Sequence, residues 1–280
     1  MSEAAPRRSN WVACVDAGNT RTKLYSFLDA KSGGPRADLL TSWTGHERGP
    51  ETQVFGGAAP RVCILSSVAS PAATERLVTA LRGAWGTEVE VIVNPSSGLE
   101  LRIQHPETVG ADRLFAARGA LLLGGESCIV VDAGTAMTVD AVEATGERGA
   151  FLGGAIAPGP DLLAESLVRR GARLQDVRPE PGARALGRHT REALLAGVVV
   201  GFEGAAVRLV QRIAEEAGCF GTAAPGAEAS ASAAEGIPVM LCGGAAHFLD
   251  GALVAEGFAV QSVPELVAYG LAAAWSSELR

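Results

Sequence analysis

The chain has 280 residues, a formal net charge of −7, 48% hydrophobic residues and 20% charged residues. This length accommodates two compact domains, and the composition is that of a soluble globular protein. The negative charge argues against a general nucleic-acid-binding or membrane-surface protein, because either function needs a basic face that contacts phosphates.

The start of the chain, residues 1–10, is polar and predicts a disordered tail without the apolar core of a signal peptide. The longest apolar stretch, around residues 194–202, is too short to span a bilayer. None of the five cysteines forms a C-x-x-C pair, so we expect free thiols and a cytoplasmic location.

The first half of the chain shows the pattern of an α/β domain, which we expect over residues 11–124. A β-hairpin is predicted over 11–16 and 20–28, with a third strand near 39–43. A strand at 61–66, a helix at 71–84 with an early proline and a strand at 89–93 follow. A helix that opens at Gly110 and ends at Gly124 then joins the two halves.

The second half, residues 125–280, repeats this pattern and predicts a second α/β domain. The expected elements are strands at 128–132, 136–143, 151–158, 237–241 and 258–263, and helices near 161–170, 188–217, 243–254 and from 264 onward. Residues 221–236 hold few large apolar side chains and predict a flexible surface loop.

Two similar segments, Val15–Lys23 and Val131–Thr138, carry the strongest functional signal. Each follows an apolar strand, places an aspartate at the strand end and turns on a glycine beside hydroxyl side chains. Glycine lets backbone N–H groups converge on a phosphate, and the aspartate can orient a hydrated Mg²⁺. The pair therefore predicts a duplicated domain that binds a nucleotide, although each segment alone also fits an ordinary hairpin turn.

Several other nucleotide and metal sites are excluded by their motifs. Neither lysine, Lys23 or Lys31, follows a glycine, so the chain has no Walker A loop. There is no G-x-G-x-x-G at the first strand and no protein-kinase H-R-D or D-F-G set. The four histidines are isolated, which argues against a histidine metal centre.

Five motifs occur in the order seen in type III pantothenate kinases, which the chain resembles over nearly its whole length. The motifs are D-x-G-N-T-x-x-K at Asp16–Lys23, G-x-D-R at Gly110–Arg113, D-x-G-T-A-x-T-x-D at Asp132–Asp140, G-G-x-I-x-P-G at Gly153–Gly159, and a helix-start segment at Thr190–Gly197. The resemblance implies the acetate and sugar kinase, Hsp70 and actin superfamily. Its fold has two ribonuclease H-like domains, with mixed sheets flanked by helices and a nucleotide in the cleft between them.

The resemblance also implies roles for the residues of these motifs. Asp112 matches the general base, and Asp132 matches the ligand of a monovalent cation, K⁺ or NH₄⁺. The residues that match contacts to ATP and its Mg²⁺ are Asp16, Ala17, Gly18, Asn19, Thr20, Arg21, Thr22, Lys23 and Thr135. The residues that match the pantothenate site are Ile103, Gly110, Ala111, Asp112, Arg113 and Thr190.

Some of these residues also have simpler interpretations. Asp112 and Thr190 lie near helix starts, where either side chain can act as an N-cap. Arg113 can pair with a carboxylate of the substrate or form a surface salt bridge. Ile103 stands where the family usually has a tyrosine, so a hydroxyl is missing and weaker pantothenate binding is expected. Cys242 and His189 likewise replace the usual threonine and asparagine.

The sequence thus predicts a kinase that transfers the γ-phosphate of ATP to the hydroxyl of pantothenate, the first step toward coenzyme A. The resemblance implies a homodimer, for which the apolar helix 188–217 is a candidate contact surface. Two alternatives remain: a kinase or phosphohydrolase of the same fold that acts on another small hydroxy acid, and a noncatalytic nucleotide-binding regulatory protein.

Overall fold

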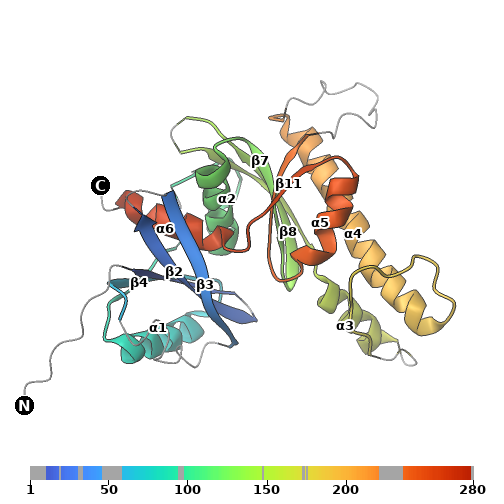
Figure 1. Cartoon of the computed structure of the whole chain (residues 1–280), viewed down its shortest axis with the longest axis horizontal. Coiled ribbons are helices and arrows are strands. Elements are labelled where there is room, and N and C mark those ends of the chain that lie inside the picture. Colours follow the sequence, from blue (N-terminus) through green and yellow to red (C-terminus); the bar gives the residue numbers. More distant parts are fainter. Residues whose placement is uncertain are drawn as a thin grey trace, which may run out of the picture. The chain divides into compact units, whose positions relative to one another are not determined.

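The computed structural model describes residues 11–18, 20–30, 34–45, 59–93, 98–146, 148–171, 174, 176–220 and 236–278 (Figure 1). The expected tail 1–10, Asn19 and all but the last residue of the expected loop 221–236 lie outside the described residues. The chain divides into two compact units. Unit 1 comprises residues 1–99, 104–124 and 265–280, and unit 2 comprises 100–103 and 125–264.

Unit 1 is built on a five-stranded sheet with the order β3-β2-β1-β4-β5. Its strands are β1 (Val12–Ala17), β2 (Arg21–Ala30), β3 (Gly34–Thr44), β4 (Val62–Ser67) and β5 (Val89–Val91). The first three strands are antiparallel, whereas β4 pairs parallel with β1 and β5 pairs parallel with β4. The central strand β1 is buried along its whole length, as its apolar run predicts.

Helix α1 (Pro71–Trp85) covers one face of this sheet (Figure 1). Ser70 caps the helix by accepting a hydrogen bond from the Ala73 N–H, and Gly86 ends it in the left-handed conformation. Leu77 and Leu81 of α1 join a core cluster with alternate residues of β1 and β4, namely Ala13, Val15, Ala17, Cys63 and Leu65. The remaining side chains of β1 and β4, including Asp16, therefore lie on the opposite face.

That opposite face contacts helices α2 (Ala111–Gly124) and α6 (Leu266–Glu278), which pack on each other. A Cβ on Gly119 would lie 2.1 Å from the Leu266 carbonyl oxygen, and one on Gly270 would lie 1.7 Å from the Phe115 carbonyl oxygen. The two backbones therefore touch directly, and only glycine fits at either position. Tyr269 of α6 packs edge to face on Phe27 of β2 and accepts a hydrogen bond from the Ala37 N–H, which attaches α6 to the sheet.

The two units divide the chain at other residues than the two domains expected from the sequence. The sequence predicted a continuous second domain from residue 125 to 280, but residues 265–280 cluster with unit 1 and residues 100–103 with unit 2. The cause is long-range packing: α6 returns to α2, and the short strand β6 (Glu100–Leu101) pairs with β9 of unit 2. Neither contact leaves a local pattern in the sequence.

Unit 2 repeats the topology of unit 1. Its sheet has the order β11-β10-β7-β8-β9-β6, so strands β9-β8-β7-β10-β11 correspond to β3-β2-β1-β4-β5, with the same parallel and antiparallel pairs. The strands are β7 (Cys128–Ala133), β8 (Ala136–Glu143), β9 (Ala150–Pro158), β10 (Pro238–Cys242) and β11 (Ala259–Ser262). The predicted duplication and the α/β class with mixed sheets are confirmed.

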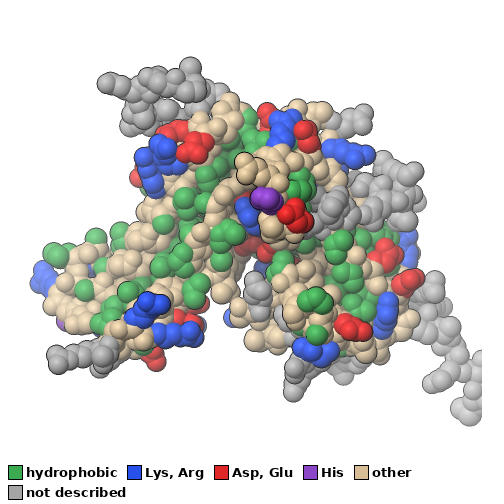
Figure 2. Space-filling model, turned by 180° about the vertical axis from the view of Figure 1, so that it is seen from behind, with side chains coloured by type: hydrophobic (Ala, Val, Ile, Leu, Met, Phe, Trp, Pro, Cys, Tyr) green, Lys and Arg blue, Asp and Glu red, His purple; other side chains and the backbone are tan. Residues whose placement is uncertain are grey.

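Helices α3 (Pro160–Arg170), α4 (Thr190–Ala217) and α5 (Ala246–Ala255) complete unit 2. Among the described residues, α4 alone is long and apolar enough to cross a membrane by length and composition. Val199, Phe202 and Val210 of α4 are nevertheless fully buried in one cluster with β7, β8 and α5. This is the packing of a core helix on a sheet. On the face shown in Figure 2, acidic and basic side chains are interspersed among hydrophobic ones.

We predict that Gly270→Ala destabilises the protein by about 1–3 kcal/mol or more, because the new methyl group forces α6 away from α2. Thermal unfolding followed by circular dichroism measures the change. Gly251→Ala in α5 is the matched control, since a Cβ there meets no atom within 4 Å. That substitution should leave stability unchanged or raise it by up to about 1 kcal/mol. Equal melting temperatures for the two variants would contradict the close approach.

Candidate active site

The first Asp-Gly loop lies at the end of strand β1 in unit 1. Asp16 is in register with Lys23 of β2 on one side and with Ser66 of β4 on the other. Paired residues of adjacent strands point to the same face of a sheet. The three side chains therefore form a row across the sheet: a half-buried ammonium, a buried carboxylate (8% exposed) and a fully buried hydroxyl.

The turn after Asp16 is closed by the Gly18 N–H, which donates to the Arg21 carbonyl oxygen at 3.0 Å. A Cβ on Gly18 would lie 3.2 Å from that oxygen, so the turn leaves little room for a side chain. Thr22 is buried and its hydroxyl donates to the Gly45 carbonyl oxygen at 3.0 Å. Among the residues expected to contact ATP here, Ala17 is buried in the core, whereas Thr20 and Arg21 are exposed.

Asp112 is the second residue of α2, and its carboxylate lies over Gly110. A Cβ on Gly110 would lie 2.4 Å from Asp112 Oδ1 and 3.6 Å from Val68, which follows β4. The Arg113 N–H donates to Asp112 Oδ1 at 2.9 Å. Because Gly110 has no side chain, the Asp112 carboxylate can occupy this space. Gly110, which was expected to contact substrate, thus has a steric role.

Burial raises the pKa of Asp112 above the ordinary value of 3.8, while the hydrogen bond and the charge of Arg113 act in the opposite direction. Asp112 lies within the first turn of α2, so it is not the N-cap residue that precedes the helix. A half-buried carboxylate with a raised pKa accepts a proton more readily than an exposed one.

The second Asp-Gly loop lies at the end of β7 in unit 2 and has the same construction. Asp132 is in register with Thr138 of β8 and with Cys242 of β10. The Gly134 N–H donates to the Ala136 carbonyl oxygen at 3.0 Å and closes the turn. Asp132 is half-buried and Thr135 is exposed.

Two further glycines pack against this second loop. A Cβ on Gly159 would lie 2.2 Å from the Gly134 carbonyl oxygen, and one on Gly243 would lie 2.4 Å from Asp132 Oδ1. The Gly159 N–H donates to the Thr135 carbonyl oxygen at 2.9 Å, and the Ala245 N–H donates to the Ala133 carbonyl oxygen at 2.7 Å. These contacts fix the loop from two sides.

Thr190 is the first residue of α4, but it is not the helix cap. The cap is His189, whose Nδ1 accepts from the Glu192 N–H at 3.4 Å, and Glu192 in turn accepts from the Arg188 N–H at 2.8 Å. The exposed hydroxyl of Thr190 is therefore not needed to begin the helix. Ile103 is half-buried and lies against Gly153 of β9, 3.4 Å from where a Cβ would stand on that glycine.

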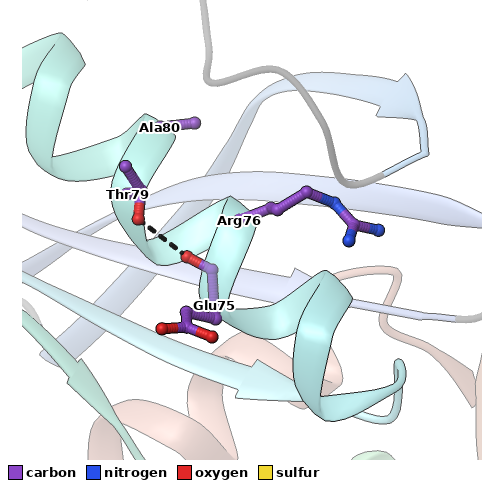
Figure 3. A pocket seen from close by; sticks show the side chains of 4 residues that line it. All are labelled: Glu75, Arg76, Thr79 and Ala80. Carbon is purple, nitrogen blue, oxygen red and sulfur yellow. Dashed lines mark hydrogen bonds between the residues drawn. The ribbon is translucent and has the colours of Figure 1, made fainter.

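Two surface hollows are lined by residues outside both loops. The first, about 410 Å³, is lined by Glu75, Arg76, Thr79 and Ala80 of α1 (Figure 3). The Thr79 hydroxyl donates to the Glu75 carbonyl oxygen there at 3.0 Å. Because α1 covers the face opposite Asp16, this hollow is not part of the loop site. The second, about 520 Å³, is lined by residues 185–187 and by Ala193, Ala196, Gly197, Val200 and Gly201 of α4.

Sequence reasoning did not assign Ser66, Gly159 or Gly243 to the sites. Gly243 directly follows the apolar run of β10, which is the same signal that marks a loop after β1 and β7. Ser66 ends the predicted strand 61–66, but its position beside Asp16 depends on the register between strands that are far apart in the sequence.

Comparison with known proteins identifies the family. The model of type III pantothenate kinase matches residues 12–212. The chain belongs to the type III pantothenate kinase family. It is 32% identical to the type III pantothenate kinase of Saccharopolyspora erythraea, over 72% of this chain and 80% of the relative. It is 40% identical to that of Thermobifida fusca over the same shares, and 40% identical to that of Thermus thermophilus over 57% and 62%. Membership makes the chain a kinase whose substrates are ATP and pantothenate.

Solved structures share the fold at low sequence identity. A Campylobacter jejuni protein described as a Baf family transcriptional activator superposes with a TM-score of 0.55 at 17% identity, covering 95% of this chain and 98% of that one. A 2-dehydro-3-deoxygalactonokinase protein from Sinorhizobium meliloti gives 0.50 at 17% identity, covering 95% and 99%. These likenesses concern the fold alone.

We predict that Gly110→Ala lowers turnover by at least about tenfold, because the methyl group displaces the Asp112 carboxylate, and small misplacements of reacting groups are costly. A coupled assay of phosphopantothenate formation measures the effect. Gly83→Ala in α1 is the control, since a Cβ there meets nothing within 4 Å. Full activity in Gly110→Ala would show that the carboxylate position is not critical.

Proposed function

We propose that this type III pantothenate kinase uses Asp112 as the general base for phosphoryl transfer from ATP to the hydroxyl of pantothenate. The observation that supports this role is the half-buried carboxylate at the start of α2, with a raised pKa and room provided by Gly110. Asp112 takes the hydroxyl proton while the substrate oxygen forms its bond to the γ-phosphorus and the bond to the β-γ bridging oxygen breaks.

Asp16 and its neighbours are proposed to hold the phosphates with Mg²⁺. Mg²⁺ in such sites is held by one or two carboxylates plus substrate phosphates and keeps several waters. The buried Asp16 carboxylate fits this donor set, and Lys23 beside it adds a positive charge. When bound, Mg²⁺ neutralises charge on the phosphates. The turn after Asp16, including its backbone N–H groups, orients the phosphates.

Asp132 is proposed to hold a monovalent cation, K⁺ or NH₄⁺, and Thr135 to contact ATP. The support is an oxygen donor on a loop that Gly159 and Gly243 hold in place. Carboxylate and carbonyl oxygens suit hard cations. A bound cation offsets phosphate charge at this loop.

Arg113 and Thr190 are proposed to contact pantothenate. A guanidinium pairs with a carboxylate such as the acid end of pantothenate, and the exposed Thr190 hydroxyl can donate a hydrogen bond. Ile103 offers apolar contact where a tyrosine would add a hydrogen bond, so affinity is expected to be a few-fold to about tenfold weaker. We further propose a cytoplasmic location.

Unit 2 is proposed to form a homodimer through the hollow beside α4. Leu186, at its rim, is 79% exposed, and Val200 of α4 is 36% exposed. Exposed apolar side chains around a groove lined by alanine and glycine are typical of contact surfaces.

We predict that Asp112→Asn slows turnover by roughly 10²–10⁴-fold, because the base is lost while the side chain keeps its size. The dissociation constant for ATP should barely change. Mass-spectrometric rates of phosphopantothenate formation and calorimetric ATP binding measure the two effects. Asp161→Asn, an exposed carboxylate in the first turn of α3, is the control and should keep full activity. Turnover of Asp112→Asn within a few-fold of the parent would refute the assignment.

The raised pKa of Asp112 adds a pH dependence to the same variant. Because the folded pKa lies above the unfolded value, this carboxyl's contribution to stability is present at low pH and lost as pH rises through the folded pKa. Asp112→Asn should therefore melt at the same or a higher temperature near neutral pH. The parent's kcat should fall on the acid side at a pH above 3.8, and the variant's residual rate should lack that limb.

We predict that K⁺ or NH₄⁺ activates the enzyme, whereas Na⁺ does so poorly, and that Asp132→Ala abolishes the response. Initial rates in chloride salts at matched ionic strength test this, with tetramethylammonium as the reference cation. Equal rates in K⁺ and tetramethylammonium would exclude the cation site.

We predict that Leu186→Asp dissociates the dimer, because a charge then replaces the exposed leucine that lines the hollow. Sedimentation velocity measures the mass. Val254→Asp is the control, since Val254 is 54% exposed on α5 and lies outside the hollow. A parent chain that sediments as a monomer at assay concentrations would contradict the proposed dimer.

A further inference from the structure

Ser66, at the carboxyl end of β4, has a fully buried hydroxyl whose oxygen finds no hydrogen-bond partner among the described residues. Buried hydroxyls are ordinarily hydrogen-bonded, because a group that loses water without a replacement partner destabilises the fold. An unpartnered hydroxyl in a native core therefore needs an explanation, and the residues around it show whether a ligand could supply the missing partner.

The surroundings of Ser66 are those of the phosphoryl-transfer residues of unit 1. Ser66 is in register with Asp16, on the face of the sheet that α1 does not cover. Two residues later, Val68 lies 3.6 Å from where a Cβ would stand on Gly110, and the Asp112 carboxylate lies at the same point. Ser66 thus lies beside the loop aspartate, two residues before the valine that lies near the start of α2.

Ser26, another buried serine of the same sheet, serves as a comparison because it lies away from the loop aspartate. Ser26 of β2 is 1% exposed and also lacks a partner among the described residues. It is in register with Ala13, however, on the face covered by the apolar cluster of α1. Nothing at Ser26 points to a ligand, which makes it the matched reference for Ser66.

The duplicated topology supports a role for the residue beside the loop aspartate. In unit 2 the residue in register with Asp132, on the corresponding parallel strand β10, is Cys242. Both units therefore place a small side chain with hydrogen-bonding capacity next to the aspartate that ends the central strand. In unit 1 this side chain is a hydroxyl, which both accepts and donates.

We propose that Ser66 is a positioning residue of the kinase, whose hydroxyl accepts a hydrogen bond from a water ligand of the ATP-bound Mg²⁺ beside Asp16. The inference rests on the proposed role of Asp16 in holding Mg²⁺. Water bound to Mg²⁺ is a strong donor, and the hydrated ion keeps several such waters. Ser66 would thereby fix the hydration shell that Asp16 alone leaves free to rotate.

The test compares Ser66→Ala with Ser26→Ala in the full chain. Calorimetry measures the dissociation constant for ATP with saturating Mg²⁺ and again with excess chelator, and kinetics give the Mg²⁺ concentration for half-maximal turnover. Ser66→Ala should weaken ATP binding with Mg²⁺ and raise the half-maximal Mg²⁺ concentration by about three- to tenfold, the range of one hydrogen bond. ATP binding in chelator and the melting temperature should not fall. Ser26→Ala should change none of the Mg²⁺-dependent quantities.

A Ser66→Ala variant that keeps the parent's Mg²⁺ dependence within twofold overturns the inference, as does an equal change in Ser26→Ala. If Ser66→Ala melts below the assay temperature, Ser66→Cys in reductant, which fills the space with a weaker hydrogen-bonding group, is measured in the same way and decides. A parent chain that forms no phosphopantothenate refutes the proposed function. The calorimetric comparison still judges Ser66 in that case, because it measures nucleotide binding and not turnover.

Discussion

The direct backbone contact between α2 and α6 is the constraint on which unit 1 depends. Gly119 and Gly270 let the two helices approach until a carbonyl of one lies where the other has no side chain. Close-packed interiors transmit such a contact with little slack. The position of α2 on the sheet, and with it the position of Asp112 beside Val68, follows from this contact. A residue of the proposed chemistry is thus held in place by a glycine of its own helix, Gly119, and by Gly270, which is far from it in sequence.

The second organising feature is that each unit ends its central strand in an aspartate and a glycine turn. The strand on one side is antiparallel and the strand on the other is parallel in both units, so each aspartate has one neighbour from a hairpin and one from a crossover. The neighbours have diverged: Lys23 and Ser66 flank Asp16, whereas Thr138 and Cys242 flank Asp132. The same backbone therefore places a cationic neighbour beside the aspartate in one unit and neutral neighbours beside it in the other.

Local signals predicted most of the elements and long-range packing explains what they missed. The hairpin strand 136–143, the helix begun by Pro71 and the loops after β1 and β7 follow from patterns within a few residues. The two-residue strand β6 forms because it pairs with β9. The packing of α6 on α2 depends on Gly119 and Gly270, which are 151 residues apart in the sequence. Asp112 and Asp132 were predicted from motifs, but Ser66 required the register between β1 and β4.

In sequence, unit 2 lies between α2 and α6, and this order has a consequence for how the chain is made. A ribosome that has synthesised residues 11–124 has released every strand of the first sheet, yet α6, one of the two helices on its second face, is still untranslated. The nascent first unit lacks α6 during the translation of about 140 further residues at about 5–20 residues per second. Unit 2, nearly continuous in sequence, is free to fold first. Unit 1 therefore becomes complete only after the whole of unit 2 has been synthesised.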